Sequence, residues 1–142
     1  MSRRIVEKEA DIQKACTDIL LLDGWRVIHT DLKQLRGMGV QEPGIADDLF
    51  IRYIQNGDPR LGVDPRGGQI YQPLCELAWI EWKRIDPRGL RTKASSLQKD
   101  WHTLERKRGA LVLVAGEDFP ATIEGFRDYY KASGLMRKRI LS

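Results

Sequence analysis

The chain has 142 residues, the length of a single domain. With 42% hydrophobic and 31% charged residues and no run of about 18 apolar residues, it reads as neither disordered nor membrane-spanning. The net charge of +4 is uneven, because residues 1–82 carry ten basic and 13 acidic side chains, whereas residues 83–108 carry nine and three. Charged residues begin at Arg3 with no apolar region behind them, so no secretory signal is expected and a cytoplasmic protein is predicted.

The first elements follow from hydrophobic periodicity and turn residues. Apolar residues at three- and four-residue spacing predict a helix over 5–23, and Gly24 is well placed to end it. A short strand is expected at 25–29, followed by a glycine-containing loop at 30–45. Residues 48–54 are rich in β-branched and aromatic side chains and predict the next strand.

The second half begins with a long excursion at 55–73, where glycine and proline exclude a regular element in the middle. The elements after it are a strand at 74–83, a helix from Ser95 or Ser96 to Arg108, a strand at 110–115 and a helix at 120–132 with a basic tail up to residue 142. The order α-β-β-β-α-β-α predicts a single α/β domain, in which helices pack against a mixed sheet.

The two cysteines, Cys16 and Cys75, lie far apart in a helical and a strand context. Neither has a second thiol or a histidine at the spacing of a zinc site, so zinc is not expected. We predict that both are small buried residues and that they form no disulfide.

Charged residues interrupt an otherwise apolar strand at Glu81 and Lys83. Residues two apart on a strand project from the same face, and Asp47 opens the neighbouring strand. Two acids beside a lysine form a site of hard oxygen ligands that suits Mg²⁺ or Mn²⁺. Such a metal ion activates water and neutralises charge on a phosphodiester, while the ammonium orients the nucleophile or stabilises the anionic transition state. A Glu-x-Lys pattern on its own, however, is more often a surface ion pair.

The first helix offers a third acid. Glu9 falls on the same side as Ile12 and Cys16, which should meet the sheet, whereas Glu7 falls on the polar face. An acid on the inward side is better explained as a metal ligand or a supporting group than by solvation. Glu9 is therefore the expected residue, with Glu7 as the alternative.

Four motifs occur in the order that a known family has them. They are Glu9-x-x-Ile12-Gln13, Gly44-x-x-Asp47, Glu81-Trp82-Lys83 and Gln98-x-x-Trp101. Together, over residues 5–116, they resemble the VRR-NUC domain of the PD-(D/E)xK nuclease superfamily, in its stand-alone form. The resemblance implies a restriction-endonuclease-like αβββαβ core, here with an extra C-terminal helix.

The resemblance also implies roles for individual residues. Glu9, Asp47 and Glu81 would bind Mg²⁺ or Mn²⁺, Lys83 would be the catalytic lysine, and Gln98 would support them. Stand-alone members act as homodimers on branched DNA such as four-way junctions, and larger relatives, among them the Fanconi anaemia-associated nuclease, process flaps.

The sequence departs from the family pattern in the Gly44 motif and after it. Ala46 stands where the family usually has proline, and Asp48 directly follows Asp47. Strand alternation places the two aspartates on opposite faces, and the motif spacing favours Asp47 as the ligand. The excursion at 55–73 also makes the gap between Asp47 and Glu81 longer than expected.

These observations predict a metal-dependent DNA endonuclease that is selective for branched DNA. The alternatives are a non-catalytic nucleic-acid-binding module of the same fold and a small restriction-type enzyme that reads base sequence. The basic segment 83–108 would attract DNA phosphates, although a solvated surface explains the charge equally well. His29 and His102 could assist proton transfer, but surface or packing roles are favoured. The expected phosphate-binding residues are Arg84, Arg88, Arg91, Lys93 and Lys99.

Overall fold

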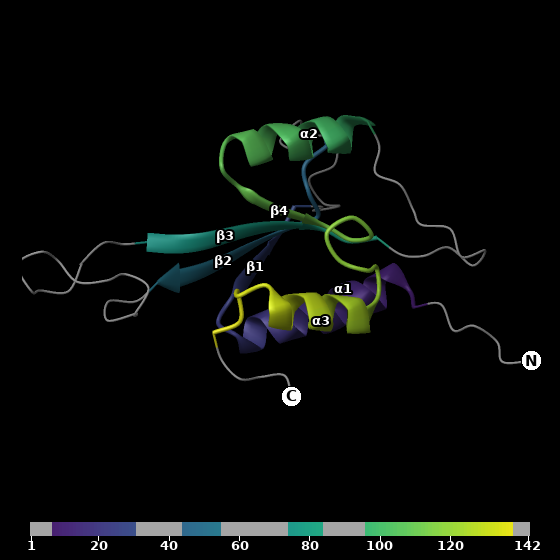
Figure 1. The fold of residues 1–142 in the computed structure, drawn as a ribbon, viewed down its shortest axis with the longest axis vertical. Helices are drawn as coiled ribbons and strands as arrows, with labels where there is room; N and C mark the ends of the chain where they lie inside the picture. Colours follow the sequence, from purple (N-terminus) through teal and green to yellow (C-terminus); the bar gives the residue numbers. More distant parts are fainter. Residues whose placement is uncertain (1–6, 31–43, 55–73, 84–95, 138–142) are drawn as a thin grey trace, which may run out of the picture.

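Three helices and four strands follow one another in the part of the chain that the computed structural model describes, residues 7–30, 44–54, 74–83 and 96–137 (Figure 1). Their order is α-β-β-β-α-β-α, as predicted. The elements are α1 (Glu9–Leu22), β1 (Arg26–His29), β2 (Asp48–Ile54), β3 (Leu74–Glu81), α2 (Ser96–Lys107), β4 (Leu111–Val114) and α3 (Ile123–Ala132).

The strands form one mixed sheet with the order β1-β2-β3-β4. β1 pairs with β2 and β2 with β3 in antiparallel fashion, whereas β3 and β4 are parallel. A parallel pair requires a crossover connection, and α2 lies within the one between β3 and β4. Figure 1 shows α2 on one face of the sheet and α1 with α3 on the other. The predicted α/β class, a mixed sheet flanked by helices, is confirmed.

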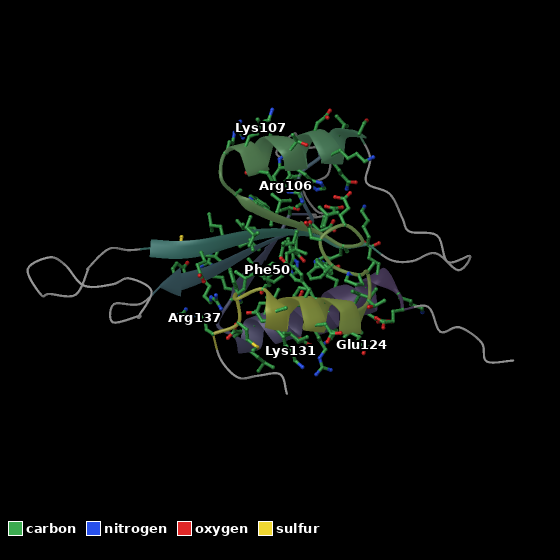
Figure 2. The ribbon with its side chains drawn as sticks, viewed as in Figure 1. Phe50, Arg106, Lys107, Glu124, Lys131 and Arg137 are labelled. Atoms are coloured by element: carbon green, nitrogen blue, oxygen red, sulfur yellow. The ribbon has the colours of Figure 1, made fainter. Side chains whose placement is uncertain are left out.

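Side-chain alternation along the strands gives each face its own apolar cluster. Phe50, Ile80 and Trp82 lie in the larger cluster, between the sheet and the α1–α3 layer, where Figure 2 shows Phe50. Trp101 of α2 and Val112 of β4 belong to a smaller cluster on the opposite face. β3 contributes Ile80 to the larger cluster, and its Trp79 packs against the smaller one. The C-terminal end of β3 is therefore covered from both sides.

The ends of several elements differ from the predicted ones. α1 begins at Glu9 with Lys8 as its N-cap, and β3 ends at Glu81, two residues earlier than expected. α3 begins at Ile123 rather than near residue 120, because the Thr122 side chain accepts a hydrogen bond from Gly125 N–H and caps the helix there. Gly24, which was predicted to end α1, and Gly109, which follows α2, have positive φ angles of 90° and 92°.

The prediction that both cysteines are buried was wrong for Cys75. Cys16 lies on the side of α1 that is buried in the core, but Cys75 is exposed, and both thiols are free. Cys75 and Leu77 share the face of β3 on which α2 lies, and Leu77 is 47% exposed. α2 therefore leaves this part of the face uncovered.

A buried ionic network lies where β2 ends and β3 begins. The Arg52 side chain is 1% exposed and donates to Asp23 Oδ2 at 3.0 Å and to Glu76 Oε2 at 2.7 Å. Its guanidinium group also lies 4.3 Å from the Trp25 ring centroid, and Tyr130 OH donates to Asp23. This network joins α1, the sheet and α3, and it lies at the opposite end of β2 and β3 from Asp47 and Glu81.

Candidate functional site

Two acids meet where β2 begins and β3 ends. Asp48 pairs with Ile80 in the antiparallel register, so Asp47 lies next to Glu81. Lys83 follows Glu81 by two residues, and Gln98 lies in the first turn of α2. The structure thus brings the four predicted catalytic residues, Asp47, Glu81, Lys83 and Gln98, to one end of the sheet.

Glu81 uses one carboxylate oxygen for both of its polar neighbours. Oε1 accepts from Gln98 Nε2 at 2.6 Å and lies 3.1 Å from Lys83 Nζ. Lys83 Nζ also lies 3.5 Å from Gln98 Oε1. The second oxygen, Oε2, is buried and has no hydrogen-bond partner among the described residues. Glu81 is 1% exposed, and burial raises the pKa of its carboxyl group, although Lys83 and a hydrogen bond from the Asp47 backbone act in the opposite direction.

Asp47 is the more accessible of the two acids. Its Oδ2 accepts a hydrogen bond from the backbone N–H of Trp82 at 2.8 Å. Burial raises the pKa of Asp47 to about 7, and the negative charge of Glu81 acts in the same direction. Two like charges are therefore held close together in a poorly solvated place. A bound proton or divalent cation would relieve the repulsion between the two carboxylates in such a place.

The neighbouring acid, Asp48, has a different set of partners. It is fully buried, and it accepts from Gln13 Nε2 at 2.9 Å and from Trp82 Nε1 at 2.8 Å. Its Oδ1 lies 2.5 Å from His29 Nδ1. Through these three contacts, Asp48 of β2 is joined to α1, to β1 and to Trp82, which follows β3. The two aspartates make separate contacts, as strand alternation predicts, and Asp47 is the one beside Glu81.

The two acids near the start of α1 also differ in their surroundings. Glu9 is half-buried, and its charge raises the pKa of both Asp47 and Glu81, so α1 carries it towards the pair. Glu7 precedes α1, and its Oε2 accepts from Ile123 N–H at 2.8 Å, at the N-terminus of α3. The expectation that Glu7 lies on the polar face of α1 was wrong.

The predicted set of three metal ligands is not assembled. Within the described ranges, no three His, Cys, Asp or Glu side chains form a group that could hold a metal ion. Glu9 acts on Asp47 and Glu81 through its charge. The donor chemistry of the pair itself suits a hard divalent cation, because both groups are carboxylates and no side chain in the described ranges is hydrogen-bonded to the buried Glu81 Oε2.

Of the predicted phosphate-binding residues, only Lys99 lies among the described ones. It is exposed on α2. Each of the other four falls in 84–95, outside the described residues: Arg84, Arg88, Arg91 and Lys93.

His102 is buried rather than exposed, in agreement with a packing role. Its Nε2 has no hydrogen-bond partner among the described residues. Burial lowers the pKa of His102, and the positive charge of Arg106 adds to this effect. His29, in contrast, has a side chain that is 55% exposed.

Sequence reasoning missed Thr30 and the two roles of Trp82. Thr30 Oγ1 donates to the carbonyl oxygens of Ala46 and Asp47, at 2.5 and 2.9 Å. Trp82 donates its amide to Asp47 and its indole N–H to Asp48. A threonine after a strand and a tryptophan between two charged residues have no special spacing, so no sequence signal singled them out.

Comparisons of the chain with models of known protein families, with curated proteins and with solved structures gave no match. In the part of the chain that the structure describes, no helix has the length and apolar character needed to cross a membrane. The site must therefore be judged by its own chemistry.

Proposed function

We propose that this chain is a metal-dependent DNA endonuclease that hydrolyses phosphodiester bonds. The observation that supports the proposal is the environment of Glu81. One of its oxygens is occupied by Lys83 and Gln98, while the other is buried beside Asp47 and has no side-chain hydrogen-bond partner among the described residues. Pure structural pairing with Lys83 would not require a second acid in the same place.

Asp47 and Glu81 would hold Mg²⁺ or Mn²⁺, with Glu9 of α1 as the third acid whose charge acts on both. When bound, the ion supplies an activated water and neutralises charge on the phosphate. Lys83 has a side chain that is only 12% exposed and an ammonium 3.1 Å from Glu81. From there it orients the attacking water or stabilises the anionic transition state. Gln98 keeps the Glu81 carboxylate in a fixed orientation.

The substrate class rests on the resemblance to the VRR-NUC domain and on charge. The segment 83–108 carries nine basic and three acidic residues, and a duplex or branched DNA is the polyanion that it would attract. A homodimer would present two sites to the two symmetric strands of a four-way junction. Sedimentation at micromolar concentration tests this part, since a 16.3 kDa species would argue against the dimer.

A non-catalytic nucleic-acid-binding module is the second candidate. The observation that favours it is that no complete three-ligand metal group is found in the described ranges. Against it stands the pair of acids, because carboxylates repel phosphate and contribute nothing to binding DNA alone.

A nuclease assay decides between the candidates. Linear duplex, single-stranded, flap and four-way-junction DNA are incubated with the protein in Mn²⁺, in Mg²⁺ and in EDTA. We expect cleavage that requires the metal and is fastest on a branched substrate. DNA binding without cleavage in either metal would favour the binding module. Cuts at one base sequence in linear duplex would favour a restriction-type enzyme.

A further inference from the structure

Gly44 lies unusually close to the start of α2. Its φ angle is +79°, and a Cβ atom at this position would lie 2.4 Å from Leu97 O and 2.7 Å from Leu97 C. It would also lie 3.2 Å from Gln98 N. All three neighbours are backbone atoms, so they cannot rotate away as a side chain would. Only glycine allows this approach.

The close contact falls on the turn of α2 that carries Gln98. The Gln98 amide donates to Glu81 Oε1 at 2.6 Å, and Glu81 Oε1 is also the atom that lies 3.1 Å from Lys83 Nζ. A Cβ at residue 44 would push this turn away from the sheet. The Gln98 side chain would move with it and lose its contact with Glu81.

The segment from Gly44 to Asp47 also carries one of the two acids. Ala46 is fully buried in the same apolar cluster as Trp101, one turn after Gln98 in α2. On the other side, Thr30 binds the carbonyl oxygens of Ala46 and Asp47. A single short segment therefore supports α2 and places Asp47 at the same time.

We propose that Gly44 is a positioning residue for the site: its missing side chain lets α2 approach closely enough for Gln98 to fix the Glu81 carboxylate. This deepens the proposed nuclease function and rests on it. With Oε1 fixed by Gln98 and Lys83, the buried Oε2 of Glu81 is the oxygen left to face a cation.

Gly109 provides a matched control for the test. It has a φ angle of +92°, similar to that of Gly44, but a Cβ there would have nothing within 4 Å. Gly44→Ala and Gly109→Ala therefore introduce the same kind of backbone strain, and only the first adds a collision. With Mn²⁺ and the best DNA substrate, we expect kcat of Gly44→Ala to fall about tenfold or more, with KM unchanged. Gly109→Ala should stay within about twofold of wild type.

A second readout does not depend on cleavage. In the metal-free protein, the side-chain amide resonances of Gln98 should shift in Gly44→Ala and remain in place in Gly109→Ala. In a Gln98→Ala background, Gly44→Ala should cost little further activity, because both changes remove the same contact. If wild-type protein cuts no DNA, the nuclease proposal fails, while the amide resonances still decide whether Gly44 positions Gln98.

Unchanged Gln98 resonances in Gly44→Ala would overturn the inference, and so would equal kcat values for the two alanine variants or additive losses in the double variant. Should Gly44→Ala fail to fold, Gly44→Asn and Gly109→Asn replace the alanine pair. Asparagine tolerates a positive φ better than alanine but still carries a Cβ. The same contrast between residues 44 and 109 is expected.

Discussion

The indole Nε1 of Trp82 donates a hydrogen bond to Asp48 Oδ2 across 2.8 Å, and both side chains are fully buried. The backbone amide of the same Trp82 donates to Asp47 Oδ2, also at 2.8 Å. One residue thus fixes two adjacent aspartates in opposite directions. Asp48 faces the core and Asp47 lies beside Glu81, so Asp48 is a structural acid and Asp47 is the one that the proposed function uses.

Substitution of each aspartate by asparagine should therefore have opposite consequences. In Asp48→Asn, one amide must replace a carboxylate that has three partners, Gln13, His29 and Trp82, and a buried donor is left unpaired. We expect the free energy of unfolding to fall by about 1–3 kcal/mol. Asp47→Asn should keep or increase the stability of the metal-free protein but abolish cleavage. Urea unfolding together with cleavage rates would check this. Cleavage by Asp47→Asn at the wild-type rate would show that Asp47 is not a catalytic residue.

Stability in EDTA should depend on pH through Asp47. Burial and the charge of Glu81 raise its pKa to about 7, whereas an aspartate in the unfolded chain titrates near 3.9, roughly. The folded state therefore binds the proton more tightly, so this contribution is fully present below about pH 4 and is lost as the pH rises to about 7. We expect a loss of roughly 2–4 kcal/mol across this window.

The matched control for this pH dependence is Asp47→Asn, which should show a smaller fall in unfolding free energy between pH 4 and 7. Mn²⁺ should also reduce the fall in the wild-type protein, because a bound cation replaces the proton. Identical pH profiles for the wild type and Asp47→Asn would mean that Asp47 does not titrate in this range.

Catalysis should require both Glu81 and Lys83. Glu81→Gln preserves the shape of the side chain but removes the negative charge of the carboxylate. Lys83→Met removes the ammonium group and keeps a side chain of similar length. We expect either change to reduce kcat by about a thousandfold or more, with DNA binding and folding retained. Lys14 on α1, whose side chain is 79% exposed and which lies outside the basic segment, supplies the control, since Lys14→Met should cleave at the wild-type rate. Near wild-type turnover by Glu81→Gln would rule out its assignment.

Glu9 and Glu7 should respond in opposite ways to loss of charge. Glu9→Gln relieves repulsion with Asp47 and Glu81, so the metal-free protein should melt at a higher temperature, bind Mn²⁺ more weakly and cleave more slowly. Glu7→Gln weakens a hydrogen bond to Ile123 N–H at the start of α3 and should lower stability by about 0.5–1 kcal/mol. Its Mn²⁺ affinity should remain that of the wild type. If Glu7→Gln binds Mn²⁺ more weakly and Glu9→Gln does not, the acid that acts on the metal site is Glu7 and not Glu9.

The sequence by itself determined the elements and the relations that are local along the chain. Periodicity and turn residues predicted the order of helices and strands, and strand alternation placed Glu81 and Lys83 together and turned Asp47 away from Asp48. These relations are set by backbone geometry over two or three residues, so they do not depend on how the domain packs.

Only the tertiary structure decided which distant groups meet. Glu7 and Ile123 are 116 positions apart, and Thr30 reaches the carbonyl of Asp47 across a separation of 17. The approach of Gly44 to Leu97 likewise depends on where α2 lies on the sheet. The exposed position of Cys75 follows from the limited area that α2 covers. Such contacts depend on how helices and sheet pack in three dimensions, and the packing of distant segments leaves no periodic trace in the chain.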